Sequence, residues 1–362
     1  MNLITKPTVR CNFKCTFCSS TYLSDDDKEI LELSRIEQFL TRFPETSTII
    51  VNGGDPLMMP VSYYWKLIDI LDRMGLDTSI SFTSNLWPFY VKPEKWETLF
   101  KHPRLGITTS FQYGSKRLKG DGSVFTEEDF RNVSDVFLER IGYRPDFIAV
   151  IDEDNEHTVL DTVRLAKELG VEAKINYVNA SGKEVVRKGI TMGGENMFFT
   201  QARMYKHYIE IHEAGLMEWE YNTKAMAVKL KGKHTTCPLS RTCDEGIRSL
   251  QPGGGYYSCG AFSDDQKYPI DFDREMAGDK ILPLRDVPEL QTMKDACYEC
   301  PMFSICNGCK KTISDTKRFG MVEDHCKLMK SLAPKIIEIN GMTGWLEPTP
   351  YVDESPSIIA RG

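Results

Sequence analysis

Residues 4–18 read Ile-Thr-Lys-Pro-Thr-Val-Arg-Cys-Asn-Phe-Lys-Cys-Thr-Phe-Cys, a β-rich run at Ile4–Arg10 followed at once by Cys11, Cys15 and Cys18. The chain of 362 residues has 11 cysteines, none of them between positions 19 and 236. An odd number of cysteines, in a sequence that does not start with a signal-peptide core, argues against a disulfide framework. We therefore expect the thiols to bind metal, on a loop that follows the first strand of a sheet.

The first half of the chain repeats this pattern of a β-rich run followed by a helical one. Further β-rich runs lie at Ser47–Asn52, Thr78–Thr83, Gly106–Phe111, Asp146–Ile151 and Val171–Asn179. Helical patterns between them cover residues 34–43, 65–74, 92–102, 126–141 and 158–169. Ser34 and Glu37 have the spacing of a capping box at the start of the first, and Gly75 and Gly170 follow the ends of two others.

Strand–helix units of roughly 30 residues, six in all, predict an α/β fold with a parallel sheet. Because eight such units close a TIM barrel, six predict a partial (β/α)6 barrel that stays open. Ligands of such sheets lie at the carboxyl ends of the strands. Gly53-Gly54-Asp55 follows the second run as Cys11 follows the first, so we expect both on the same rim.

The organisation of the chain is expected to comprise the barrel at 1–180, a bridging region at 181–236 with a helix at Phe199–His212, a cysteine-rich domain at 237–333, and a C-terminal tail at 334–362. In the cysteine-rich part, periodicity weakens and turn sequences such as Pro252-Gly253-Gly254-Gly255 are frequent. That composition predicts a small domain folded around metal rather than around an apolar core.

The charge balance bears on partners and location. Lys plus Arg is 45 and Asp plus Glu is 52, which gives a formal charge of −7. This balance does not favour a nucleic-acid partner, although it leaves room for a local basic groove. Apolar runs fall far short of the roughly 20 residues that span a bilayer. We expect a cytoplasmic protein without a membrane partner.

The chemistry of the first three cysteines follows from their spacing, C-x3-C-x2-C. Structural zinc sites commonly use two CxxC pairs, which this segment lacks. A [4Fe–4S] cluster held by three cysteines would have one iron open to a small molecule. The spacing favours the cluster over the alternatives, a zinc knuckle or a group of reactive thiols.

This motif, with Phe17 before its last cysteine, resembles the signature of the radical S-adenosylmethionine (SAM) superfamily. The resemblance implies that Cys11, Cys15 and Cys18 hold a catalytic [4Fe–4S] cluster, that SAM binds the open iron, and that Phe17 packs near the adenine. One electron, from a reductant such as flavodoxin or ferredoxin, would cleave SAM to methionine and a 5′-deoxyadenosyl radical that abstracts hydrogen from substrate. The protein would supply placement and exclusion of water.

The same resemblance implies a set of SAM-binding residues. Gly53-Gly54-Asp55-Pro56 resembles the family's GGE-P segment, which receives the methionine ammonium, with Asp55 one methylene shorter than the usual Glu. A Gly-Gly turn after a strand is the alternative interpretation of that segment. The other positions are assigned by their order along the chain: Ser110 and Gln112 to the ribose or carboxylate, Arg117 to the carboxylate, and Ile151 and Tyr177 to the adenine. For Arg117 the alternative is a solvated loop arginine.

The C-terminal cysteines resemble the SPASM domain, which carries two auxiliary [4Fe–4S] clusters. The family arrangement implies one cluster on Cys237, Cys243, Cys259 and Cys309, and another on Cys297, Cys300, Cys306 and Cys326. With the first motif this makes three clusters and uses every cysteine once. The spacing between Cys306 and Cys309 is one residue shorter than is common, and a zinc ribbon is the alternative.

Radical SAM–SPASM enzymes mostly modify peptides or proteins, by crosslinking, epimerisation or rearrangement. In sulfatase maturases an Asp follows the third cysteine of the first auxiliary cluster, whereas this sequence has Gly260, which disfavours oxidation of Ser or Cys. Many peptide maturases carry an N-terminal leader-recognition domain, which we do not expect here because the first cysteine is at residue 11. A small molecule, or an amino acid attached to a nucleotide or other carrier, is therefore a competing substrate. Tyr256, Tyr257 and Asp264 are candidate radical donors or acids, with buried core roles as the alternative. Two other classes stay open: a binding module stapled by metal, and an electron carrier.

Overall fold

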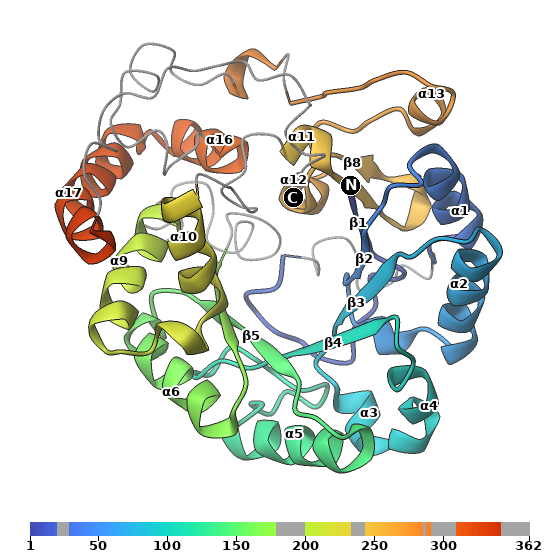
Figure 1. Ribbon diagram of the computed structural model, residues 1–362, viewed down its shortest axis with the longest axis horizontal. Helices are drawn as coiled ribbons and strands as arrows, with labels where there is room; N and C mark the ends of the chain where they lie inside the picture. The colour runs from blue at the N-terminus through green and yellow to red at the C-terminus, as the bar shows by residue number, and fades with distance from the viewer. Residues whose placement is uncertain (20–28, 179–199, 233–242, 285–286, 291–308, 342–362) are drawn as a thin grey trace.

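The computed structural model describes residues 1–19, 29–178, 200–232, 243–284, 287–290 and 309–341. Its sheet has the strand order β6-β5-β4-β3-β2-β1-β7-β8 and does not close (Figure 1). The six predicted strands are confirmed and parallel: β1 Asn2–Thr5, β2 Thr48–Val51, β3 Ser79–Thr83, β4 Leu105–Ser110, β5 Asp146–Ile151 and β6 Ala173–Tyr177. The chain therefore has the predicted open, partial barrel.

The cysteine-rich part adds two strands to this sheet, which the sequence analysis did not predict. Strand β7, Ile247–Leu250, pairs in parallel with β1, and β8, Tyr256–Tyr257, pairs antiparallel with β7. Leu250 and Tyr256 are buried in the main hydrophobic core, together with Phe272. The expectation that this region folds around metal rather than an apolar core is therefore wrong for residues 247–272.

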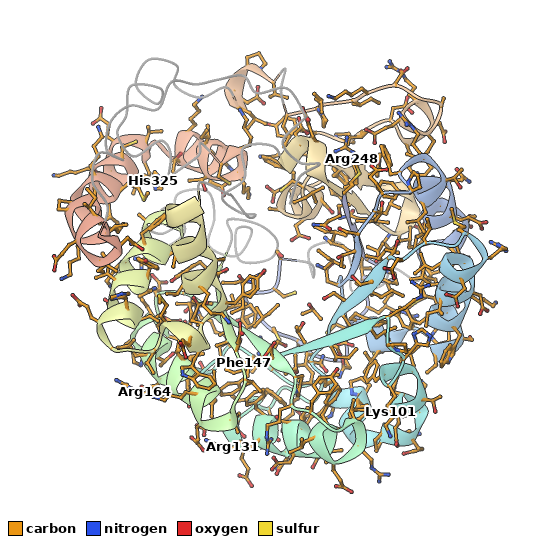
Figure 2. The ribbon with its side chains drawn as sticks, viewed as in Figure 1. Lys101, Arg131, Phe147, Arg164, Arg248 and His325 are labelled. Carbon is orange, nitrogen blue, oxygen red and sulfur yellow. The ribbon has the colours of Figure 1, made fainter. Side chains whose placement is uncertain are left out.

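Helices cover the outer, convex face of the sheet (Figure 1). They are α1 Leu33–Arg42, α2 Val61–Arg73, α3 Trp87–Val91, α4 Glu97–Phe100, α5 Glu127–Ile141 and α6 Val159–Leu169. The strand side chains that face them, such as Leu3, Ile49 and Phe82, are fully buried. The ring centroids of Phe147 on β5 and Phe130 on α5 are 5.0 Å apart. The charged residues Lys101, Arg131 and Arg164 lie on the perimeter of the molecule (Figure 2).

The opposite, inner face of the sheet is only half-buried. Because side chains alternate along a strand, the neighbours of the buried residues point inward. These include Ser81, Thr83, Thr108 and Ser110, and the hydroxyls of Thr83 and Thr108 lie 3.1 Å apart. A polar, partly accessible inner face is where a ligand of this sheet can lie.

Helix boundaries correct two of the predictions. The capping box at Ser34 and Glu37 is absent, because α1 begins at Leu33 and Ser34 donates a hydrogen bond to Glu32 instead. In place of the expected helix at 92–102 there are a 3-10 turn at Pro93–Lys95 and α4, and α3, which was not predicted, ends just before them. Proline lacks the N–H that a continuous helix needs, and it disfavours helical backbone at the preceding Lys92.

Helices of the second half form another layer beside β6. They are α9 Thr200–Glu213, α10 Tyr221–Gly232 and α17 Val322–Asn340, and α16 Lys310–Phe319 packs against α17. The helix predicted at Phe199–His212 is thus confirmed as α9. The prediction that a C-terminal tail begins at residue 334 is wrong, because α17 continues through Pro334. Ala333 and Ile336 of this helix are buried in the same cluster as Tyr205 of α9.

Short helical segments complete the described chain. They are η2 Pro56–Met58, η4 Glu156–Thr158, η6 Met217–Trp219, α11 Cys243–Gly246, η7 Pro252–Gly254, α12 Gly260–Asp265, α13 Phe272–Met276 and η8 Pro288–Leu290. None of the helices in the described ranges has both the length and the apolar character needed to cross a bilayer.

Candidate active site

The cysteine loop, residues 11–18, lies between two other loops at the carboxyl ends of the strands. Backbone hydrogen bonds join Lys14 N to Leu118 O (2.8 Å) and Thr16 N to Lys116 O (3.0 Å), on the segment that follows β4. On the other side, Asp55 N donates to Arg10 O (2.7 Å). The predicted common rim is therefore confirmed, and main-chain bonds fix the loop on both sides.

Glycine is required where the loop after β2 meets the cysteine loop. A Cβ at Gly54 would lie 1.9 Å from Arg10 O, closer than any side chain tolerates. Gly53 has φ +116°, which disfavours other residues, and its Cβ would lie 2.8 Å from Thr8 O. The Gly-Gly pair thus allows the loop after β2 to approach the main chain beside Cys11 closely. A turn after a strand does not by itself require such contacts.

The thiols of Cys11, Cys15 and Cys18 are half-buried. Burial, followed by the nearby charge of Asp55, raises the pKa of Cys11 well above that of an ordinary thiol. A thiol held protonated is a poor nucleophile, which disfavours the reactive-thiol alternative. A metal cation, in contrast, deprotonates the thiols that it binds.

Three thiols on one short loop are a donor set that suits a [4Fe–4S] cluster. Where the structure places side chains, no three His, Cys, Asp or Glu residues are close enough together to bind a single metal ion. The cysteines of a [4Fe–4S] cluster bind different irons, so they stand farther apart than ligands of one zinc. Cys11, Cys15 and Cys18 still interact electrostatically with one another, as their spacing on one short loop requires.

Arg117 is a buried cation beside the cysteine loop. Its Nη1 donates to Ser110 Oγ (2.8 Å), and its Nε and Nη2 donate to Gln112 Oε1 (3.0 and 2.6 Å). Its Cζ lies 5.3 Å from the centroid of the Phe17 ring. The structure thus brings together four residues that the sequence analysis assigned to SAM, Phe17, Ser110, Gln112 and Arg117.

The charge of Arg117 has no carboxylate partner in the described parts of the chain; both acceptors are neutral. Burial lowers its pKa, and the charges of Cys15, Cys18 and Cys11 act in the opposite direction. A buried guanidinium without an anion is unfavourable, so this position is suited to an anionic ligand. The solvated-loop alternative for Arg117 is wrong, because its exposed fraction is 5%.

The carboxylate of Asp55 has partners within the chain, unlike the role that the resemblance implies. It accepts hydrogen bonds from Leu57 N (2.9 Å), Asn85 N (2.9 Å) and Ser84 Oγ (3.0 Å), and it caps the η2 turn that begins at Pro56. Burial raises its pKa to about 6, and these hydrogen bonds oppose the shift. Its oxygens therefore brace two loops and are not directed at a ligand.

Ile151 and Tyr177 do not join this group. Ile151 is buried against Val159 and Val163 of α6, on the outer face of β5. Tyr177 is also buried on the outer face, where its hydroxyl bonds His207 Nδ1 of α9 and the two rings stack. Their side chains therefore do not face an adenine on the inner face, since only their neighbours point inward, and a contact through their main chain stays a prediction.

Asn85, at the carboxyl end of β3, was missed. Its Nδ2 lies 2.9 Å from Asn12 Oδ1 and 3.9 Å from Cys11 Sγ, as a hydrogen-bond donor to both. The signal was available: Ser84 and Asn85 directly follow the third predicted strand, Thr78–Thr83, on the same rim as Cys11 and Gly53.

The C-terminal cysteines are described only in part. Cys259 and Cys309 immediately precede α12 and α16, and the charge of Cys309, after burial, raises the pKa of Cys259. Their proximity agrees with the shared cluster that the resemblance implies, and Cys326 lies on α17. Cys237, Cys297, Cys300 and Cys306 lie outside the described residues, as does the side chain of Cys243, so the ligand sets stay a prediction.

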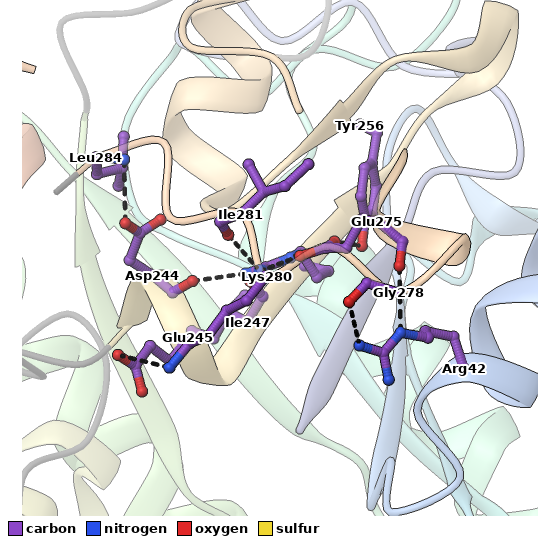
Figure 3. Close-up of polar contacts among 11 residues, drawn as sticks. Arg42, Asp244, Glu245, Ile247, Tyr256, Glu275, Gly278, Lys280, Ile281 and Leu284 are labelled. Atoms are coloured by element: carbon purple, nitrogen blue, oxygen red, sulfur yellow. Dashed lines mark hydrogen bonds and ion pairs between the residues drawn. The ribbon is translucent and has the colours of Figure 1, made fainter. Parts of the chain in front are cut away.

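The three candidate acids and donors near Cys259 have distinct surroundings. Asp264 pairs with the buried Lys6, next to β1, and accepts a hydrogen bond from Ser19 Oγ (2.7 Å). Tyr256 donates to Glu275, which pairs with Arg248 at 2.6 Å in a buried network (Figure 3). Tyr256 and Tyr257 are buried, so the core role holds for both, whereas Asp264 joins α12 to the end of the cysteine loop.

Comparison with known proteins agrees with this arrangement. By structure, the chain is similar to anSMEcpe with bound AdoMet, with a TM-score of 0.68 and 15% identity over 94% of this chain and 99% of that chain. It is similar to anSMEcpe with bound AdoMet and Cp18Cys peptide (TM-score 0.67, 14% identity, 94% and 99% covered). It is also similar to Streptococcus suis SuiB bound to precursor peptide SuiA (TM-score 0.56, 15% identity, 84% and 70% covered). These likenesses establish a shared fold.

The sequence itself identifies the barrel. Residues 5–182 match the family described as Radical SAM superfamily, a range that runs from β1 past the end of β6 and includes the cysteine loop. The fold, the C-x3-C-x2-C loop at the carboxyl end of β1 and the buried cation beside it agree with that match. Through residues 5–182, the chain belongs to the radical SAM superfamily.

Proposed function

We propose that this chain reductively cleaves SAM at a [4Fe–4S] cluster held by Cys11, Cys15 and Cys18, and uses the resulting 5′-deoxyadenosyl radical to abstract a hydrogen atom from a peptide or protein. The observation that carries the proposal is the buried, unpaired charge of Arg117 beside the cysteine loop. When bound, the cluster would supply the electron that cleaves the sulfonium bond.

Different residues of the chain would bind different parts of SAM. Arg117 would receive the SAM carboxylate, and Ser110 and Gln112 would hold its guanidinium in one orientation. Phe17 would offer an apolar surface to the adenine, next to the guanidinium. Gly53 and Gly54 would keep the neighbouring main chain close enough to the cysteine loop for backbone carbonyls to receive the ammonium group.

Two auxiliary clusters on the C-terminal cysteines are part of the proposal, in a SPASM-type domain. The proximity of Cys259 and Cys309 supports it. Four protein ligands on each cluster would leave no open iron, so these clusters would carry electrons or shape the substrate pocket rather than bind SAM.

The substrate class rests on a fold shared with proteins that bind peptides. The compared structures include anSMEcpe with a peptide and SuiB with precursor peptide SuiA. Oxidation of Ser or Cys is disfavoured, because Gly260 has no side chain at the position where sulfatase maturases have an Asp. Crosslinking, epimerisation or rearrangement are the proposed outcomes, and a small molecule or a carrier-bound amino acid is the alternative.

The proposal is tested by anaerobic reconstitution with iron and sulfide, reduction, and quantification of 5′-deoxyadenosine. The wild-type chain should release it from SAM, Cys15→Ala should not, and Thr16→Ala in the same loop should retain activity, since Thr16 engages Lys116 through its main chain. Retained activity in Cys15→Ala, or bound zinc in place of iron, would overturn the proposal. Offering peptides and small molecules to the active enzyme then separates the two substrate classes.

A further inference from the structure

Asn85 reaches a cysteine of the proposed catalytic cluster from a strand that carries none of the signature residues. Its side chain lies at the carboxyl end of β3 and is 6% exposed. The amide nitrogen donates to Asn12 Oδ1 at 2.9 Å and to Cys11 Sγ at 3.9 Å. A side-chain amide has two N–H groups, so it can make both bonds at once.

The orientation of this amide is fixed by its oxygen. Asn85 Oδ1 accepts a hydrogen bond from the backbone N–H of Trp87 at 2.9 Å, at the start of α3. An amide rotated by 180° would set its NH2 group against that N–H donor and lose the bond. The donor end of Asn85 must therefore face Cys11 and Asn12.

The turn that presents Asn85 is held by Asp55. The Asp55 carboxylate accepts from Asn85 N (2.9 Å) and from Ser84 Oγ (3.0 Å), and the same Ser84 hydroxyl accepts from Leu86 N (3.0 Å). Leu86 has φ +55°, an uncommon conformation for a branched side chain that needs such support. Asp55 thus positions the turn, which explains where its carboxylate oxygens are directed.

We propose that Asn85 is a positioning residue that donates an N–H···S hydrogen bond to the Cys11 thiolate and thereby raises the reduction potential of the cluster that Cys11 helps to hold. This inference rests on the proposed function of the cysteine loop. A reduced cluster carries one more negative charge than the oxidised one, so donors to its sulfur ligands stabilise the reduced form more. Phe13 N, 3.4 Å from Cys11 Sγ, is a main-chain donor to the same sulfur and remains when Asn85 is replaced.

The test is an EPR-monitored redox titration of the reconstituted full chain without SAM, read on the signal that changes when SAM is added. Asn85→Ala removes the donor, and Asn85→Asp removes it while keeping an acceptor for Trp87, so the turn is retained even if the alanine variant fails to fold. Asn155→Ala and Asn155→Asp are the matched controls. Asn155 is likewise buried after a strand, with bonds to Tyr113 O (3.0 Å) and Val150 O (3.1 Å) but none to a cysteine.

The expected result is a lower midpoint potential in the Asn85 variants, with the larger shift in Asn85→Asp because of its charge, and an unchanged potential in the Asn155 variants. An unchanged potential in the loaded Asn85 variants would overturn the inference. An equal shift in the Asn155 variants would also overturn it, since the effect would then reflect general loosening of the rim. A wild-type chain that takes up no iron and sulfide refutes the proposed function itself, which separates the two failures.

Discussion

The guanidinium of Arg117 lies over the ring of Phe17, with Cζ 5.3 Å from the ring centroid, and its hydrogen bonds go to two neutral side chains. A cation, an aromatic ring and three cysteines therefore share one corner of the barrel rim. A zinc knuckle or a group of structural thiols would have no use for this arrangement, whereas a ligand with a carboxylate and an adenine would engage both groups.

Replacement of Arg117 by Met should weaken SAM binding by roughly 10- to 100-fold. A hydrogen bond to a charged group contributes about 1.5–3 kcal/mol, and tenfold in affinity corresponds to about 1.4 kcal/mol. The dissociation constant of SAM for the reconstituted protein measures this loss. The matched control is Lys116→Met, which removes a neighbouring cation paired with Asp152 at 2.6 Å, and binding should be little changed.

A second measurement on the same variant separates binding from folding. Since an unpaired buried charge is unfavourable, Arg117→Met should not lower the free energy of unfolding of the apoprotein. A variant that loses stability and SAM affinity together would show that Arg117 is a structural residue.

Gly54→Ala should prevent cluster assembly. The new Cβ would lie 1.9 Å from Arg10 O, so the cysteine loop must shift, at a cost of about 3 kcal/mol or more. Iron and sulfide content and a urea denaturation curve report the two effects. Gly106→Ala on β4, where a Cβ meets nothing within 4 Å, is the control and should load normally. Normal iron and sulfide content in Gly54→Ala would contradict the close contact between Gly54 and the main chain of Arg10.

The pair of Lys6 and Asp264 should contribute stability that depends on both partners. The Lys6 side chain is 3% exposed, and Asp264→Ala would leave its charge buried and unpaired, a loss of about 3–5 kcal/mol. The double variant Lys6→Met with Asp264→Leu should recover most of that loss in urea denaturation. A double variant as unstable as Asp264→Ala would assign the effect to Ser19, which also donates to Asp264.

His207 should make the second helical layer sensitive to acid. Burial lowers its pKa to about 4, from a usual value near 6.5, in spite of Glu156, which acts in the opposite direction; Lys206 and Arg203 add to the lowering. Between pH 4 and 6.5 the His207 ring stays neutral in the native state, whereas in the unfolded chain it binds a proton. The contribution of His207 to the free energy of unfolding is therefore full above pH 6.5 and is lost as the pH falls toward 4. The loss amounts to a few kcal/mol.

The free energy of unfolding, measured between pH 4 and 7, checks this prediction. His207→Gln should lose this part of the pH dependence, and His157→Gln, at a nearby exposed histidine, should keep the wild-type dependence. The raised pKa of Asp55, about 6, gives the wild-type curve a slope of opposite sign in the same window, so the difference between the wild type and His207→Gln is what tests His207. A difference between these two proteins that does not change with pH would contradict the depressed pKa.

Much of the barrel and of its rim follows from the sequence, because the decisive signals are local. The cysteine motif follows a strand directly, and the Gly53-Gly54 pair follows the next, so the carboxyl ends bring them together. Strands β7 and β8 could not be predicted in this way. They lie outside the strand–helix repeat that indicates the other six strands, and β7 pairs with β1, more than 200 residues away in sequence. Strand β8 has only two residues, too few for a periodic pattern.

The face of the sheet on which a strand side chain lies is a second feature that the sequence predicts only in part. Strand β5 reads Asp-Phe-Ile-Ala-Val-Ile, apolar on both faces, so no alternation indicates that Ile151 faces outward. Strand β6 reads Ala-Lys-Ile-Asn-Tyr, and here the alternation with Lys174 and Asn176 does place Tyr177 on the buried side. The partners of Asp55 depend on the turn at Ser84 and Asn85, 29 and 30 residues away, which no local pattern reveals.

The most direct test of the central claim is Mössbauer spectroscopy of the anaerobically reconstituted chain, loaded with iron-57, before and after SAM is added. Three cysteine ligands leave one iron of the first cluster open, so SAM should change the isomer shift of a single iron site and leave the remaining sites unchanged. A spectrum that SAM does not alter, or a protein that binds zinc without iron at Cys11, Cys15 and Cys18, would contradict the account.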